Sequence, residues 1–175
     1  MAYSDRTPST GLKSIYKEYV IRAWQAKDRD KVVELIEACL KPYGIALDTG
    51  EGGADEDALR VEEFYHKDDK GEFFVTERDG KIVATAAYYK IHRGPDSVEI
   101  RKMYIVPEHR RDGLGRTLMG VLETAIKSRG YRNVYVETIS VLKEACKFYP
   151  SLGYKPVQDS PDTPRCDLLL HKFLV

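Results

Sequence analysis

Residues 105–119 read Ile105-Val106-Pro107-Glu108-His109-Arg110-Arg111-Asp112-Gly113-Leu114-Gly115-Arg116-Thr117-Leu118-Met119. The apolar run from Val98 to Val106 predicts a strand, which Pro107 ends. Glycines at 113 and 115 allow the backbone to approach a ligand without a Cβ in the way. The helix predicted after them begins with amides that have no partner within the helix, at the positive end of its dipole. A strand, a glycine pair and a helix start in this order predict an anion site.

Two common phosphate-binding patterns do not fit this stretch. A nucleoside-triphosphate P-loop needs glycine where Arg110 stands and lysine where Arg116 stands. A dinucleotide fingerprint needs a third small residue at position 118, which is leucine. A glycine-rich helix start that only makes a tight turn remains the alternative to an anion site.

Composition sets limits on the function. The 175-residue chain is long enough for one domain with a sizeable core. Its 28 Lys and Arg residues balance 28 Asp and Glu residues, which argues against a dedicated nucleic-acid binder. No apolar run approaches the roughly 18 residues of a membrane span, and the polar N-terminus does not resemble a signal peptide. We therefore expect a cytoplasmic protein with no membrane or nucleic-acid partner.

The cysteines and histidines predict neither disulfides nor a metal site. The three cysteines are widely spaced and lack C-x-x-C pairing, which indicates reduced thiols. The four histidines show no metal-ligand spacing with one another or with the cysteines, so no metal is expected. These residues are Cys39, Cys146, Cys166, His66, His92, His109 and His171.

The rest of the chain predicts one mixed α/β domain over residues 19–175, preceded by a flexible N-terminal arm over residues 1–18. Asp79-Gly80 between two β-rich runs is a strong hairpin signal. Strand, helix and strand around the glycine loop suit a parallel crossover. The predicted strands are 19–24, 72–77, 81–89, 98–106, 133–139, 154–157 and 165–173. The predicted helices begin near residues 29, 58, 114 and 141.

A second block gives the glycine loop a family context. Residues 145–154 read Ala145-Cys146-Lys147-Phe148-Tyr149-Pro150-Ser151-Leu152-Gly153-Tyr154. This block and Arg110-x-x-Gly113-x-Gly115 resemble, in order and spacing, the two signature blocks of the GNAT superfamily of acyl-CoA N-acyltransferases. The resemblance covers roughly residues 19–175. It implies a mixed, mostly antiparallel central sheet of about six or seven strands, splayed at the cofactor site, with helices on both faces.

The resemblance also implies how acetyl-CoA would be bound as acyl donor. Backbone groups of Tyr104, Ile105 and Val106 would hold the pantetheine arm. The amides of the glycine loop would hold the pyrophosphate, because a row of N–H donors suits a diffuse anion. Those amides belong to Arg111, Asp112, Gly113, Leu114, Gly115 and Arg116. A homodimer is common in the family.

Acyl transfer to an amine requires a base, an oxyanion site and an acid. The amine must lose a proton, since an alkylammonium has a pKa of about 10. Glu99 matches the glutamate base of some branches and Glu137 that of others; a water could also serve, and Glu99 could instead be a surface residue paired with Arg101. Tyr149 matches the tyrosine acid that protonates the departing thiolate. Alternation places Glu99, Arg101 and Met103 on one face of the strand and Lys102 on the other.

Several features leave the assignment open. Pro150 disfavours a helical conformation at Tyr149, so the helix is expected to kink or stop there. Leu142 stands where many members have a cofactor-binding asparagine. The acidic, glycine-rich segment 48–57 predicts either a flexible loop or an acidic lip that attracts a cationic amine. The leading hypothesis is an N-acetyltransferase acting on a primary amine of a small molecule, amino acid or peptide. The alternative is a non-catalytic acyl-CoA-binding or protein-interaction domain of the same fold.

Overall fold

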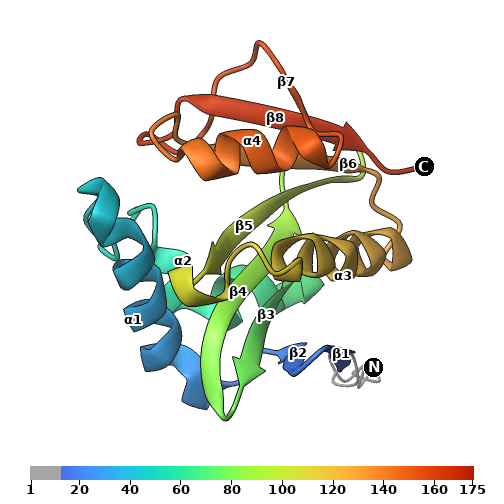
Figure 1. Ribbon diagram of the computed structural model, residues 1–175. Coiled ribbons are helices and arrows are strands. Elements are labelled where there is room, and N and C mark those ends of the chain that lie inside the picture. Colours follow the sequence, from blue (N-terminus) through green and yellow to red (C-terminus); the bar gives the residue numbers. More distant parts are fainter. Residues whose placement is uncertain (1–12) are drawn as a thin grey trace, which may run out of the picture.

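A single sheet organises the part of the chain that the computed structural model describes, residues 13–175. Within it the strand order is β1-β2-β3-β4-β5-β6-β8-β7 (Figure 1). All neighbours are antiparallel except β5 and β6, which are parallel. The mixed, mostly antiparallel sheet is therefore confirmed, with one strand more than expected. The strands are β1 (Ser14–Tyr16), β2 (Tyr19–Ala23), β3 (Gly71–Arg78), β4 (Lys81–Lys90), β5 (Ser97–Ile105), β6 (Asn133–Thr138), β7 (Lys155–Pro156) and β8 (Leu168–Phe173).

The helices lie close to where the apolar periodicity predicted them, with one exception. The helix expected over 58–66 forms in two pieces, because Arg60 leaves the helical backbone region. The second piece is a π-helical turn that buries Tyr65, whose hydroxyl donates to Asp57 Oδ2 at 2.5 Å. No helix in the described part of the chain is both long and apolar enough to cross a bilayer. The main helices are α1 (Arg29–Leu40), α2 (Glu56–Leu59), α3 (Leu114–Ser128) and α4 (Lys143–Ser151); the short ones are η1 (Ala26–Asp28), η2 (Lys41–Tyr43), η3 (Glu62–His66), η4 (Lys67–Asp69) and η5 (Pro107–His109).

Two apolar cores hold the helices on opposite faces of the sheet (Figure 1). Successive side chains of a strand point to opposite faces of the sheet, so the strands contribute to both cores. Phe74 belongs to the core under α3 and Phe73 to the core under α1. The predicted apolar stripe of α3 is buried, and each buried leucine contributes about 1.5–3 kcal/mol. Packing from both faces fixes β4 and β5, the strands that position the site.

Residues 14–16, assigned by the sequence to a flexible arm, instead form β1. They pair with β2 in a hairpin in which Ile15 faces Val20. The Tyr16 ring stacks on Tyr19 at 6.4 Å, which gives this short strand an aromatic contact that its polar composition concealed. Residues 1–12 of the predicted arm lie outside the described residues.

Candidate active site

The two parallel strands at the centre of the sheet separate halfway along their length. β5 and β6 pair from Ser97 with Asn133 to Ile100 with Val136, and no further. Beyond this point a gap of ≈ 90 Å³ opens between them, with α4 covering it. The splay that the resemblance implied is present, and it gives a ligand access to the middle of the sheet.

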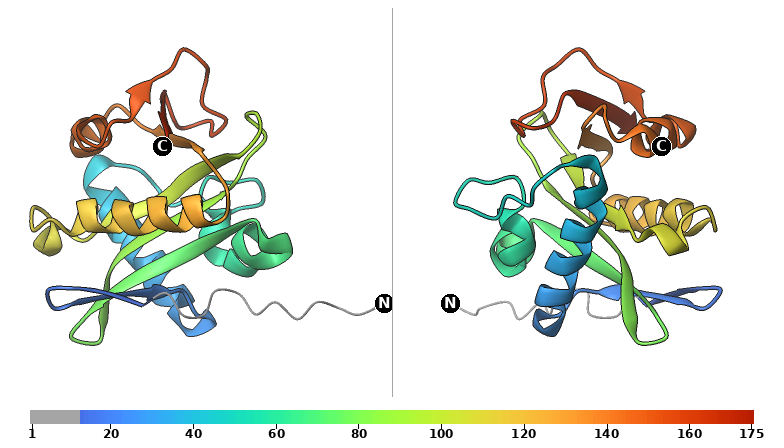
Figure 2. Two further views of the ribbon diagram at one scale, coloured as in Figure 1. Left: turned by 90° about the vertical axis from the view of Figure 1, so that its right-hand side faces the viewer. Right: turned by 60° about the vertical axis from the view of Figure 1, so that its left-hand side comes forward.

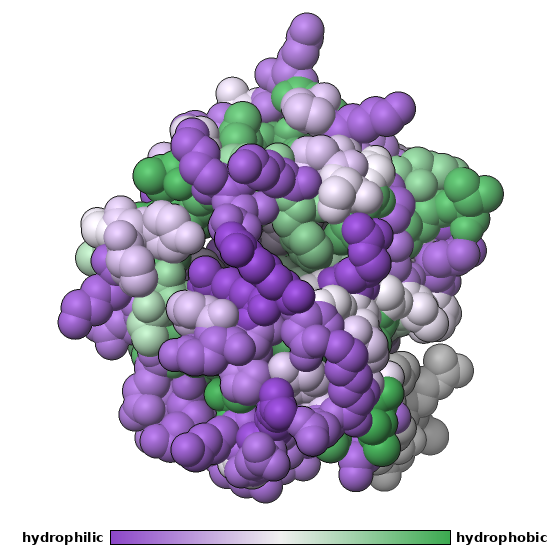
Figure 3. Space-filling model, viewed as in Figure 1, coloured by the Kyte–Doolittle hydropathy of each residue, from purple (hydrophilic) through white to green (hydrophobic). Residues whose placement is uncertain are grey.

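A groove of ≈ 390 Å³ runs from the start of α3 toward this gap. Gly113 adopts a left-handed φ of 81°, and Arg111 in the same loop has a φ of 62°. The first amide of α3 bonded within the helix belongs to Thr117, which donates to Gly113 O at 3.1 Å. The three amides before it have no intrahelical partner and are available to an anion. Figure 3 shows hydrophilic side chains at the centre of this face of the molecule, whereas most of the exposed lining of the groove is apolar.

The two glycines are needed for the shape of this groove. A Cβ at Gly113 would lie 2.5 Å from the Tyr16 hydroxyl, and one at Gly115 would lie 3.2 Å from the Phe148 ring. Both glycines line the groove, so the backbone lies open to a ligand there. The site therefore fits an elongated anionic ligand such as acyl-CoA, with its pyrophosphate at the helix start.

The edge of β5 is partly available to such a ligand. The Val106 amide donates to Val83 O at 3.0 Å. In an antiparallel ladder with this register, the backbone groups of Tyr104, two residues earlier, also point toward β4. The Ile105 backbone therefore faces the gap, and its carbonyl accepts from Arg110 Nε at 2.7 Å. Of the three residues expected to offer backbone groups, Ile105 does so, whereas the Val106 amide is already bonded. Met103, two positions earlier, lines both the gap and the groove and was not foreseen.

Glu99 lies where two cavities meet. Its side chain is 6% exposed, and it lines both the strand gap and a second cavity of ≈ 410 Å³. Arg101 Nη1 lies 3.3 Å from Glu99 Oε1. Burial raises the pKa of Glu99 to about 7; Arg101 opposes the rise, and the carboxylates of Glu137 and Asp57 add to it. Glu99 can therefore gain and lose a proton near neutral pH, which suits a general base.

A β-bulge changes the predicted arrangement around Glu99. The register between β4 and β5 shifts at Ala87 and Thr85, and Lys102 takes a left-handed φ of 50°. The prediction that Lys102 faces away from Arg101 was wrong, because the extra residue turns Lys102 onto the same side. Both cations reach Asp57, Arg101 through Nε at 3.0 Å and Lys102 through Nζ at 3.1 Å.

The acidic segment 48–57 is largely turned inward. Asp55 is fully buried between Lys102 and Arg165, which bond to both of its oxygens. Burial alone would raise the pKa of Asp55, but these two cations outweigh it and lower the pKa to about 2. The carboxylates that the sequence suggested as an acidic lip are thus mostly neutralised by internal partners, and an attraction for cations from this segment is correspondingly weak.

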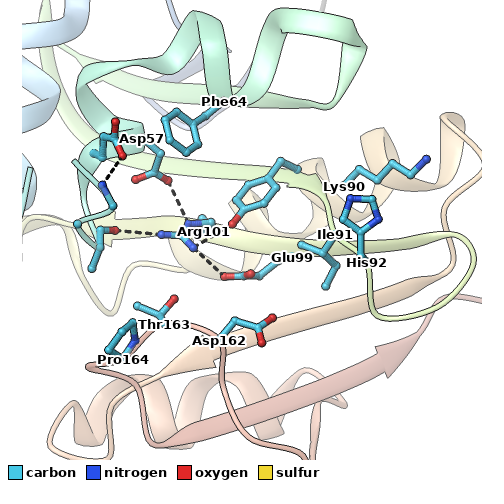
Figure 4. A pocket seen from close by; sticks show the side chains of 15 residues that line it. Asp57, Phe64, Lys90, Ile91, His92, Glu99, Arg101, Asp162, Thr163 and Pro164 are labelled. Carbon is cyan, nitrogen blue, oxygen red and sulfur yellow. Dashed lines mark hydrogen bonds and ion pairs between the residues drawn. The ribbon is translucent and has the colours of Figure 1, made fainter. Parts of the chain in front are cut away.

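The second cavity has the position of an acceptor site. It lies beside α2, at the other end of the strand gap from the groove, and Glu99 and Arg101 line it from β5 (Figure 4). Figure 4 shows Asp162, Thr163 and Pro164 approaching from the loop between β7 and β8. Arg93 holds this loop by bonds to Ser160 O at 2.7 Å and Asp162 at 2.9 Å.

Glu137 is committed to the same loop. Its side chain is 2% exposed, and its two oxygens accept from the amides of Asp162 at 2.6 Å and Thr163 at 2.9 Å. Glu137 lines the strand gap, so both candidate bases come together there, but only Glu99 also lines the acceptor cavity. The geometry favours Glu99 as the base and Glu137 as an anchor of the loop.

Tyr149 lies at the donor side of the gap. It lines both the gap and the groove, and burial raises its pKa, so the hydroxyl keeps its proton at neutral pH. α4 continues one residue past Pro150, to Ser151, so the proline lies inside the helix and next to its end. Pro150 falls in the last turn, so its missing amide removes a single hydrogen bond of the helix ladder, and short bonds such as Leu152 N to Tyr149 O at 3.0 Å end the helix.

Comparison with known proteins agrees with this geometry. The sequence model of the Acetyltransferase (GNAT) family matches residues 30–154. The chain is 25% identical over 139 residues to the uncharacterized N-acetyltransferase YjgM of Escherichia coli, covering 79% of this chain and 83% of that protein.

Solved structures share the fold. A GNAT-family acetyltransferase from Staphylococcus aureus Mu50 superposes with a TM-score of 0.80 at 18% identity, covering 90% of this chain and 99% of that one. The PaiA N-acetyltransferase of Thermoplasma acidophilum, solved in complex with coenzyme A, gives 0.72 at 19% identity, covering 89% and 99%. The chain belongs to the GNAT family of acyl-CoA-dependent N-acetyltransferases.

Proposed function

We propose that this acetyltransferase moves an acetyl group from acetyl-CoA to a primary amine of a small molecule, amino acid or peptide. One observation carries the proposal: Glu99 lines both the acceptor cavity and the strand gap, and Tyr149 lines both the gap and the groove. A base on the acceptor side and an acid on the donor side thus flank one reaction space. The small volume of the gap, ≈ 90 Å³, favours a short acyl group.

The roles of the residues follow from their positions. Acetyl-CoA supplies a thioester-activated acyl group when it is bound. Glu99 takes a proton from the entering ammonium, directly or through a water, and its pKa of about 7 makes this efficient near neutral pH. The exposed edge of β5 around Ile105 offers amide donors for the negative charge that develops on the acyl oxygen. The Tyr149 hydroxyl remains protonated and can give its proton to the leaving sulfur.

Binding of the acyl donor provides the first test. At about 100 times its dissociation constant, acetyl-CoA is expected to stabilise the folded protein by roughly 2.7 kcal/mol, because it binds only the native state. Thermal unfolding with acetyl-, propionyl- and succinyl-CoA measures this, and a thiol-release assay against a panel of amines, amino acids and peptides identifies the acceptor. Absence of a shift with all three thioesters would overturn the proposed donor.

Substitution of Tyr149 by phenylalanine tests the acid. Turnover is expected to fall by about 10- to 100-fold, since proton donation to the thiolate is lost. The dissociation constant for CoA should stay within about twofold, because the ring is retained. Steady-state kinetics and calorimetric titration with CoA measure the two effects.

Tyr154→Phe is the matched control. The Tyr154 ring lies 5.9 Å from that of Tyr149, but its hydroxyl donates to Glu123 and it lines none of the three cavities. This variant should lose some stability and keep its turnover. Equal turnover in the two variants and the native enzyme would remove Tyr149 as the acid.

A further inference from the structure

The β1–β2 hairpin contacts the loop before α3 (residues 110–113, the anion loop) chiefly through Asp112, and its Tyr19 hydroxyl also lies 3.0 Å from His109 Nδ1 just before the loop. The Tyr16 hydroxyl donates to Asp112 O at 2.9 Å, and Lys17 Nζ donates to the same carbonyl at 3.1 Å. Lys17 also pairs with the Asp112 carboxylate, and the Tyr19 hydroxyl donates to Asp112 Oδ2 at 3.3 Å. Both views of Figure 2 show the blue hairpin beside the yellow segment that begins α3. One loop residue is thus held by both its backbone and its side chain.

Holding the Asp112 carbonyl orients the next amide. The C=O of Asp112 and the N–H of Gly113 belong to one trans peptide plane and point in opposite directions. Tyr16 and Lys17 hold the Asp112 carbonyl on the side of the hairpin, so the Gly113 N–H points away from the hairpin. Of these four residues only Gly113 lines the groove. The hairpin therefore directs an anion-binding amide toward the groove.

The hairpin also offsets an unfavourable charge. A carboxylate next to an anion site repels the anion, and Asp112 lies two residues before the first turn of α3. The Lys17 ammonium group forms an ion pair with this carboxylate and offsets its negative charge. The pair is about half exposed, 51% for Lys17 and 40% for Asp112, and such surface pairs add little to stability. Its main effect is therefore expected on the affinity for the anion.

We propose that Tyr16 and Lys17 are positioning residues for the pyrophosphate of acyl-CoA, which fix the anion loop and neutralise Asp112 from a separate hairpin. The inference rests on the proposed function, since it requires that acyl-CoA binds in the groove. Neither residue touches the groove, so both act through Asp112 and Gly113.

Binding of CoA to the intact protein, measured by calorimetric titration, tests the inference. Tyr16→Phe removes one hydrogen bond and is expected to raise the dissociation constant about fivefold. Lys17→Met leaves the charge of Asp112 unpaired. This is expected to raise the dissociation constant about tenfold at low salt, with a smaller effect at high salt. Lys17→Arg should restore most of the affinity. Lys13→Met, which removes the same charge from an exposed position four residues earlier, should change it less than twofold.

A donor without pyrophosphate separates positioning from general damage. With S-acetylpantetheine the KM of Tyr16→Phe and Lys17→Met should equal that of the native enzyme, whereas the KM for acetyl-CoA rises. CoA affinities within twofold of the native value, or equal losses for both donors, would overturn the inference while leaving the acetyltransferase function intact. Failure of the native protein to bind CoA would instead overturn the proposed function, and this inference with it.

Discussion

Replacement of Glu99 by glutamine is expected to lower kcat/KM at pH 8 by about 10²- to 10³-fold, because the amine then loses its proton only to water. The native enzyme should show an acid limb with an apparent pKa near the value of about 7 that burial gives Glu99. In the variant this limb should be absent. The dependence of kcat/KM on pH, measured with saturating acetyl-CoA, gives both results.

The same substitution should change stability in a pH-dependent way. The pKa of Glu99 in the folded protein is raised from an ordinary 4.5 to about 7, so its contribution to stability is complete below pH 4.5 and is lost as the pH rises through about 7. At about 1.4 kcal/mol per pKa unit, the buried carboxylate costs up to about 3 kcal/mol at pH 8. Glu99→Gln should therefore be more stable than the native protein at pH 8 and lose this advantage near pH 4. Chemical denaturation at the two pH values measures this.

Glu137→Gln distinguishes the two candidate bases. Glutamine keeps one amide oxygen, so one of the two loop amides that Glu137 now binds loses its partner. The loop beside the acceptor cavity should loosen and the KM for the amine should rise, while the acid limb persists and moves to lower pH, because the Glu137 carboxylate helps to raise the pKa of Glu99. Full activity of Glu99→Gln with an unaltered acid limb would move the base to Glu137 or to water.

Local sequence patterns predicted the parts of the site that depend on local structure. Gly113 and Gly115 require a positive φ or a close approach, and the strand and helix on either side have clear periodicity. The second block likewise placed Tyr149 after the expected helix and strand. These features follow from residues close together in the chain, and the structure has them where the sequence indicated.

The electrostatic setting of Glu99 could not be predicted in the same way. Asp57 is 44 positions from Arg101, and Asp55 is 110 positions from Arg165. A one-residue bulge at Lys102 brings these charges to one side of β5, and simple alternation gives the opposite result. The presence of Glu99, Arg101 and Lys102 among four successive positions was itself a sign of a buried polar network, since three ionisable residues rarely lie so close together in a central strand.

Replacement of Gly113 by glutamate is expected to abolish CoA binding, with a dissociation constant raised at least about 100-fold. The residue has a φ of 81°, a conformation that costs a non-glycine residue about 1–2 kcal/mol. Its Cβ would lie 2.5 Å from the Tyr16 hydroxyl, so the Tyr16 side chain must shift and its hydrogen bond to the Asp112 carbonyl is strained or lost. The new carboxylate adds repulsion at the positive end of α3, where the pyrophosphate is expected.

Gly120→Glu provides a control on the same helix. Gly120 is exposed within α3, and a Cβ there would meet nothing within 4 Å. The substitution adds the same charge to the same helix without entering the groove, and it exchanges glycine for a better helix former. Thermal shift with acetyl-CoA should therefore be lost in Gly113→Glu and kept in Gly120→Glu. Gly113→Ala should fall between them, because it has the backbone strain and the contact with Tyr16 but no charge. If Gly113→Glu kept the shift of the native protein, the amides at the start of α3 would not be the site of the pyrophosphate, since no anion could stay bound beside a carboxylate held at that position.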